Sequence, residues 1–109
     1  MLQVTEELIH NMTNLIVQKC APQKVILFGS HARGTANRHS DLDFMIIEEK
    51  IAGDNRTRTL ADLGQLFFSY DLPIDFLIYS PEEIARWKET PNHVIAHALS
   101  EGKVLYERH

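Results

Sequence analysis

The sequence predicts a single small α/β domain, in which a small mixed sheet is flanked by helices. Apolar runs of strand length cover residues 24–30, 42–49 and 72–80. Segments with helical periodicity precede, separate and follow these runs. A chain of 109 residues can bury one hydrophobic core, so we expect one domain over residues 1–109.

The first predicted helix covers residues 5–20, and the hydroxyl of Thr5 can cap its start. Cys20 ends this segment and is the only cysteine in the sequence. One thiol can build neither an internal disulfide nor a zinc cluster, so we interpret Cys20 as a half-buried thiol. The apolar residues that recur at helical spacing in this segment are Leu8, Met12, Leu15 and Ile16.

A second long helix is predicted over residues 56–70, with its apolar residues on one face. We assign the aromatic cluster of Phe67, Phe68 and Tyr70 mainly to the core, with one side able to meet a partner helix. The residues expected on the apolar face are Leu60, Leu63, Phe67 and Tyr70.

Two helix starts carry clear capping signals near the C-terminus. Ser80 and Glu83 have the spacing of a capping box around Pro81. Thr90 and Pro91 repeat this pattern at the start of the next predicted helix. Gly102 is expected to end that helix, and residues 103–107 are predicted to form a final short strand.

Composition and charge exclude several classes of protein. The net charge of −4 and the pI of about 5.8 argue against a protein that mainly coats nucleic acid, so we expect no direct nucleic-acid binding. No apolar run has the length of a membrane span. The N-terminal residues show no basic region before an apolar one, so we expect no signal peptide and a cytoplasmic protein.

Three aspartates stand at the ends of the predicted strands. Side chains alternate along a strand, so Asp41 and Asp43 point the same way while Leu42 points into the core. Asp75, in the third apolar run, can reach the same rim. Converging carboxylates repel one another, but they are suitable ligands for divalent cations. We therefore predict a site for two Mg²⁺ ions, about 3.5–4 Å apart, that could serve phosphate chemistry.

Phosphate-binding groups precede the aspartates. Gly29 and Ser30 end the first predicted strand, and a short helix after them would point its backbone N–H groups at the same rim. Gly29 would let a phosphate approach the backbone, and the Ser30 hydroxyl could donate a hydrogen bond to it. Arg33 has two possible roles, contact with a phosphate or a bridge to a carboxylate at a strand end.

The stretch GSHARGTANRHSDLD, from Gly29 to Asp43, resembles the signature of nucleotidyltransferases related to DNA polymerase beta. It is most similar to the minimal nucleotidyltransferase (MNT) group, whose pattern is GSxARGxxxxxSDxD, and all fixed positions of that pattern are present. The segment PIDFLI supplies Asp75 as the third carboxylate of the family. The resemblance covers roughly residues 20–80 and implies the polymerase beta palm-like fold.

The resemblance also implies a function. Members of the family use Mg²⁺ and transfer the nucleotidyl group of a nucleoside triphosphate to an acceptor. Gly29 and Ser30 would hold the phosphates, and Asp41, Asp43 and Asp75 would hold the metal ions and act in catalysis. Minimal members are antitoxins of helical HEPN toxins, and some attach AMP from ATP to a toxin tyrosine. A single domain fits such a large protein acceptor.

Two other functions remain open from the sequence. The chain could be a binding module that holds nucleotide without turnover and neutralises its partner by complex formation. It could also modify small molecules, as aminoglycoside-modifying members of the superfamily do, whereas a nucleic-acid polymerase fits least. A binding module would still neutralise its partner after loss of Asp41 and Asp43.

Several residues outside the fixed pattern have simpler interpretations. His31 and His39 occupy free positions of the pattern, and we expect them at the surface. His93 and His97 have the i, i+4 spacing of metal ligands on a helix, but no third ligand accompanies them, so a zinc site is disfavoured. Trp87 and Tyr106 are expected to pack internally or to contact a partner.

Overall fold

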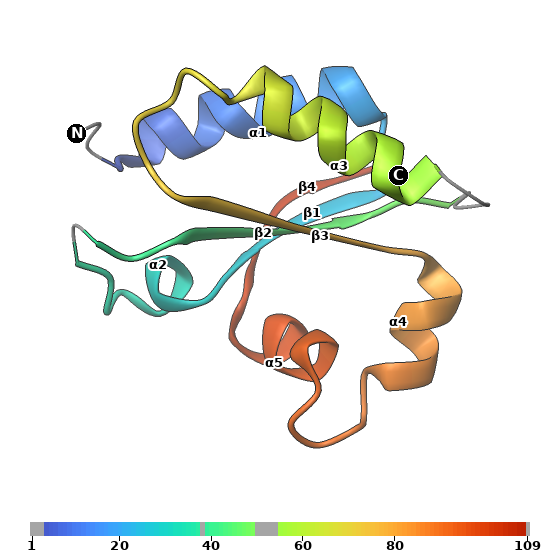
Figure 1. The fold of residues 1–109 in the computed structure, drawn as a ribbon. Helices are drawn as coiled ribbons and strands as arrows, with labels where there is room; N and C mark the ends of the chain where they lie inside the picture. The colour runs from blue at the N-terminus through green and yellow to red at the C-terminus, as the bar shows by residue number, and fades with distance from the viewer. Residues whose placement is uncertain (1–3, 38, 50–54, 109) are drawn as a thin grey trace.

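A computed structural model describes residues 4–37, 39–49 and 55–108 and contains one four-stranded sheet (Figure 1). The strand order is β3-β2-β1-β4. β1 is antiparallel to both β2 and β4, whereas β2 and β3 are parallel. The predicted mixed sheet is therefore confirmed. The strands are β1 (Lys24–Phe28), β2 (Leu42–Ile47), β3 (Ile74–Tyr79) and β4 (Lys103–Glu107).

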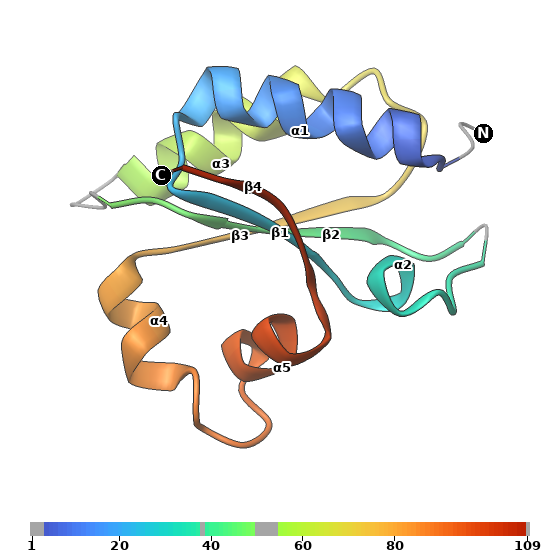
Figure 2. The same ribbon diagram turned by 180° about the vertical axis from the view of Figure 1, so that it is seen from behind.

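Helices cover both faces of the sheet. In Figures 1 and 2, α1 and α3 lie on one face, while α4 and α5 lie on the other. The short helix α2 follows directly after β1, close to one end of the sheet. The helices are α1 (Glu6–Cys20), α2 (Ser30–Arg33), α3 (Asn55–Leu66), α4 (Pro81–Trp87) and α5 (Val94–Glu101).

The strand β2 has two covered faces, which explains why its residues 44–47 are all apolar and buried. Phe44 is fully buried in the cluster that packs beneath α1 and α3. Its ring stacks on Phe76 of β3 at a centroid distance of 5.8 Å, and Phe76 in turn stacks on Phe67 at 5.7 Å. Met45, the next residue of β2, is buried on the opposite face with Ile95 of α5.

The capping signals at the N-termini of α1 and α4 are confirmed. Thr5 accepts a hydrogen bond from the Leu8 N–H at 3.1 Å, and α1 ends at Cys20 as predicted. Ser80 and Glu83 form a complete capping box at the start of α4. Glu83 also pairs with Arg56, so this cap joins α4 to α3.

The predicted start of the last helix is wrong. Residues 90–92 form a turn, in which Asn92 adopts a left-handed conformation with a φ of 65°. This conformation cannot belong to a right-handed helix. α5 therefore begins at Val94, and His93 caps it by accepting a hydrogen bond from the Ile95 N–H at 3.1 Å. The predicted end of the helix at Gly102 is confirmed.

The aromatic cluster after α3 is only partly internal. The helix ends at Leu66, and residues 67–69 form a turn instead of continuing the helix to residue 70. This turn buries Phe67, which is 3% exposed, and turns Phe68 outward, where it is 87% exposed. The assignment of Phe68 to the core is therefore wrong. Leu60, expected on the apolar face, is exposed as well.

We predict opposite consequences for truncation of the two neighbouring phenylalanines. Phe67→Ala should lower the free energy of unfolding by about 3–5 kcal/mol, because it removes a buried ring from the aromatic stack. Phe68→Ala should change it by no more than about 0.5 kcal/mol, because this side chain is already in solvent. Urea unfolding of both variants measures the difference, and equal losses would contradict the described turn.

Candidate active site

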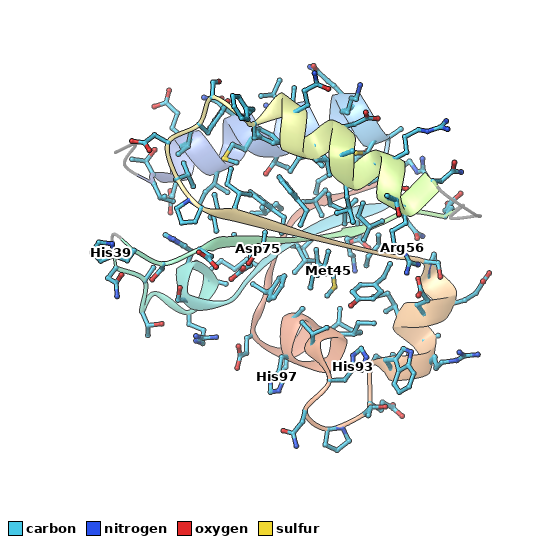
Figure 3. All side chains as sticks on the ribbon, in the orientation of Figure 1. His39, Met45, Arg56, Asp75, His93 and His97 are labelled. Carbon is cyan, nitrogen blue, oxygen red and sulfur yellow. The ribbon has the colours of Figure 1, made fainter. Side chains whose placement is uncertain are left out.

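Three carboxylates meet at one end of the sheet. Asp43 of β2 lies opposite Asp75 in the parallel pairing of β2 with β3. Asp41 directly precedes β2. Carboxylate oxygens of the three residues lie within 4.8 Å of one another. The convergence that side-chain alternation predicted is therefore present, and Figure 3 shows Asp75 at the end of the sheet beside α2.

The position of this group follows from the strand pattern. Leu42 and Phe44 are fully buried on the face beneath α1 and α3. Asp43 alternates with them and shares its face with Met45. α5 packs on this face around Met45. The carboxylates lie farther along, where the partly exposed Asp43 and the exposed Asp41 and Asp75 can accept a ligand from solvent.

The electrostatics of the site are dominated by Asp43. Burial, first, and the charges of Asp75 and Asp41 together raise the pKa of its carboxyl group to about 6. His31 and Arg33 oppose this rise in the pKa of Asp43, with smaller effects. The protein alone therefore leaves the negative charge of Asp43 only partly compensated near neutral pH.

Gly29 is required by the close approach of Asp43. A Cβ atom at Gly29 would lie 2.2 Å from Oδ2 of Asp43, which is far inside contact distance. The backbone of Gly29 also has φ 77° and ψ −159°, a conformation essentially restricted to glycine. Glycine at this position thus lets the turn after β1 sit directly against the carboxylate.

The short helix predicted after Gly29 is present as α2. It begins at Ser30, so the first N–H groups of α2 and the Ser30 hydroxyl lie just after the turn that contacts Asp43. Farther along, the Ser40 hydroxyl accepts a hydrogen bond from the Asn37 N–H at 2.9 Å. Ser40 therefore stabilises the turn that leads into Asp41, which gives this fixed position of the motif a structural role.

Arg33 pairs with a residue that the sequence did not single out. Its Nη1 donates a hydrogen bond to Oε2 of Glu101 at 2.9 Å, across 68 positions of the chain. Of the two roles considered, the structure thus displays the bridge to a carboxylate, although that carboxylate ends α5 and not a strand. Contact of Arg33 with a phosphate remains a prediction.

His31 is closer to the site than its free position in the motif suggested. It is partly buried, its Nε2 lies 3.5 Å from the carbonyl oxygen of Ser40, and its charge acts on Asp43. It also lines a cavity of about 510 Å³ beside α1 and β4. His31 is therefore less exposed than the surface position expected for it, whereas His39 is exposed as expected.

The remaining candidates do not join the carboxylates. His93 is the N-cap of α5 and has an extended backbone, and its ring accepts a hydrogen bond from the Ile95 N–H and stacks on Trp87 at a centroid distance of 4.8 Å. Figure 3 shows His93 and His97 on the α5 side, away from Asp75. Burial raises the pKa of the Cys20 thiol to about 11, so this thiol is a weak nucleophile at neutral pH.

The three aspartates form a chemically suitable group for a divalent cation. They offer oxygen atoms only, which favours Mg²⁺ over zinc or copper. The pKa of Asp43 is raised by burial and by the charges of Asp75 and Asp41, and a bound cation would offset these effects. The group was found from the sequence, but its distances depend on the pairing of β2 with β3.

Comparison with known proteins places the chain in a family. The model of the family described as polymerase beta, nucleotidyltransferase, matches residues 10–109. The chain belongs to the polymerase beta nucleotidyltransferase family. It is 34% identical over 85 residues to the "Putative protein adenylyltransferase MJ0604" of Methanocaldococcus jannaschii, covering 77% of this chain and 78% of that protein. It is 28% identical over 112 residues to "Putative protein adenylyltransferase MJ1305" of the same organism, and the alignment covers 94% of this chain and 75% of that protein.

Solved structures of this family share the fold. The structure described as "a putative nucleotidyltransferase from Sulfolobus solfataricus" aligns with a TM-score of 0.61 at 18% identity, over 94% of this chain and 79% of that one. A chain of the tri-AMPylated Shewanella oneidensis HEPN toxin in complex with MNT antitoxin aligns with a TM-score of 0.57 at 15% identity, over 95% and 74%. The nucleotidyltransferase fold implied by the motif is therefore confirmed.

Among the described residues, no helix is both long and apolar enough to cross a membrane.

We predict that the site does not tolerate a side chain at Gly29. Gly29→Ala should lower the free energy of unfolding by about 2–4 kcal/mol, because it combines backbone strain with a clash against Asp43. Gly64→Ala is a matched control in the exposed middle of α3, where a Cβ meets no atom within 4 Å. The control should stabilise the protein by about 0.5–1 kcal/mol. Chemical unfolding tests both, and a neutral Gly29→Ala variant would contradict the described contact.

Proposed function

We propose that this nucleotidyltransferase transfers AMP from ATP to a tyrosine hydroxyl of a cognate HEPN-type toxin and thereby acts as an antitoxin. The observation that carries the proposal is the convergence of Asp41, Asp43 and Asp75 next to the Gly29–Ser30 turn. Relatives named protein adenylyltransferases support AMP as the transferred group. The fold shared with a chain of the HEPN toxin–MNT antitoxin complex supports the partner.

The proposed reaction is a displacement at the α-phosphorus of ATP. The acceptor hydroxyl oxygen forms a bond to this phosphorus, and the bond to the oxygen that bridges to the β-phosphate breaks. Pyrophosphate leaves, and the hydroxyl proton passes to a carboxylate and then to water. Asp75 is suited to receive this proton, because it is exposed and lies on the edge strand β3.

The other residues would bind and orient the reactants. Asp41, Asp43 and Asp75 would hold Mg²⁺, which when bound neutralises phosphate charge and activates the acceptor hydroxyl. The N–H groups at the start of α2 and the Ser30 hydroxyl would donate to phosphate oxygens. Gly29 keeps this turn free of a side chain, so phosphate can approach the backbone.

Substrate and location form part of the same proposal. ATP and Mg²⁺ are abundant in the cytoplasm, and we place the reaction there. The acceptor is a folded protein and not a nucleic acid, in keeping with the net charge of −4. Neither the binding of ATP nor the transfer of AMP requires contact with a membrane.

Intact-mass spectrometry of the partner tests the proposal directly. The chain is mixed with Mg²⁺, ATP and the product of the adjacent gene, which we expect to be a HEPN-type toxin, and the mass of that product is followed over time. We expect an added AMP, located by peptide fragmentation on a tyrosine. The Asp41→Asn/Asp43→Asn double variant should lose the modification, because it removes two of the three carboxylates.

Asp62→Asn on α3 is the matched control, because it removes an aspartate charge outside the carboxylate group, and it should retain full transfer. Size-exclusion chromatography of the same mixtures reports whether a complex forms. A stable complex that never gains mass would overturn the transferase proposal in favour of neutralisation by binding. AMP transfer by the double variant would show that these aspartates are not the site.

A further inference from the structure

We propose that Glu101 is a positioning residue, which holds the Arg33 guanidinium away from the three aspartates so that a divalent cation can occupy them. The inference rests on the proposed function, because it concerns the metal-binding state of the same carboxylates. It assigns a role to a residue that lies 58 positions beyond Asp43 and outside the motif.

The first step of the argument is the ion pair itself. Arg33 and Glu101 are joined at 2.9 Å, and their side chains are 45% and 36% exposed. An ion pair with this exposure contributes little to the stability of a fold. The pair does, however, direct the Arg33 guanidinium toward the end of α5.

The second step is competition for Arg33. The backbone N–H of Arg33 donates a hydrogen bond to the carbonyl oxygen of Gly29 at 3.1 Å, and a Cβ at Gly29 would lie 2.2 Å from Oδ2 of Asp43, so the Arg33 side chain leaves the very turn that contacts the aspartates. Guanidinium groups bind carboxylates strongly and often through two hydrogen bonds. Three converging carboxylates would therefore attract Arg33 if Glu101 did not hold it. An arginine bound there would compete with Mg²⁺ for the same oxygen atoms.

The third step is the rigid placement of Glu101. It is the last residue of α5, whose residues Ile95 and Ala98 are fully buried. At the following residue, Gly102, a Cβ would lie 2.3 Å from the Ala98 carbonyl oxygen and 2.6 Å from Cγ2 of Ile26. The end of α5 is thus packed directly on β1, so the Glu101 backbone has a fixed position from which to hold Arg33.

Metal binding without nucleotide tests this role independently of catalysis. Mn²⁺ is titrated calorimetrically into the wild-type protein and into Glu101→Gln, Arg33→Gln and the double variant. We expect Glu101→Gln to weaken Mn²⁺ binding about two- to fivefold, because Arg33 becomes free to pair with the aspartates. The double variant should regain wild-type affinity or better, because the competing guanidinium is gone.

Glu49→Gln is the matched control, because Glu49 also forms an ion pair with an arginine, Arg108, at 2.9 Å. Glu49 follows the C-terminal end of β2, whereas the three aspartates lie at its N-terminal end. This control should leave Mn²⁺ affinity unchanged. An unchanged affinity in Glu101→Gln, or a double variant as weak as Glu101→Gln, would overturn the inference. Wild-type protein that binds no Mn²⁺, or binds it equally after Asp75→Asn, would instead overturn the metal site of the proposed function.

Discussion

The central physical interaction of this site is the electrostatic repulsion among the three carboxylates of Asp41, Asp43 and Asp75 at one end of the sheet. Asp43 is the most strongly affected, because burial and the charges of Asp75 and Asp41 together raise its pKa to about 6. Such an arrangement costs stability in the absence of a cation. A bound divalent ion reverses the effect, so the same repulsion that strains the free protein favours metal binding.

The scaffold maintains this arrangement through packing on both faces of β2. The parallel pairing with β3 sets Asp43 against Asp75, and the stack of Phe44, Phe76 and Phe67 holds the two strands and the end of α3 together. Gly29 then allows the turn into α2 to approach Asp43 without a side chain between them. The carboxylates proposed to bind metal and the groups proposed to bind phosphate thereby lie on rigid neighbouring elements, which suits a reaction that depends on positioning.

The sequence predicts much of this, because strand alternation and a contiguous motif are local signals. Asp41, Asp43, Asp75 and the Gly29–Ser30 turn were found in this way. The sequence did not predict features that depend on distant contacts or on a single backbone angle. These features are the pairing of Arg33 with Glu101, the outward turn at Phe68, and the start of α5. Thr90 and Pro91 have the residue types of a helix start, but Asn92 adopts a left-handed backbone conformation that a right-handed helix cannot contain. The helix α5 therefore begins only at Val94.

The most direct test of the central claim is the stability of wild type and Asp43→Asn across pH, with and without Mg²⁺. Because the folded-state pKa of Asp43 lies near 6, above the ordinary value of 3.8, ionisation penalises the folded state progressively from about pH 4 to pH 6 and fully above it. Without metal at pH 8, Asp43→Asn should therefore be the more stable protein, by about 1–2 kcal/mol after allowance for solvent screening. Near pH 4 this advantage should vanish, and saturating Mg²⁺ at pH 8 should stabilise wild type alone. A variant less stable than wild type in metal-free buffer at pH 8, with no response of wild type to Mg²⁺, would contradict the account.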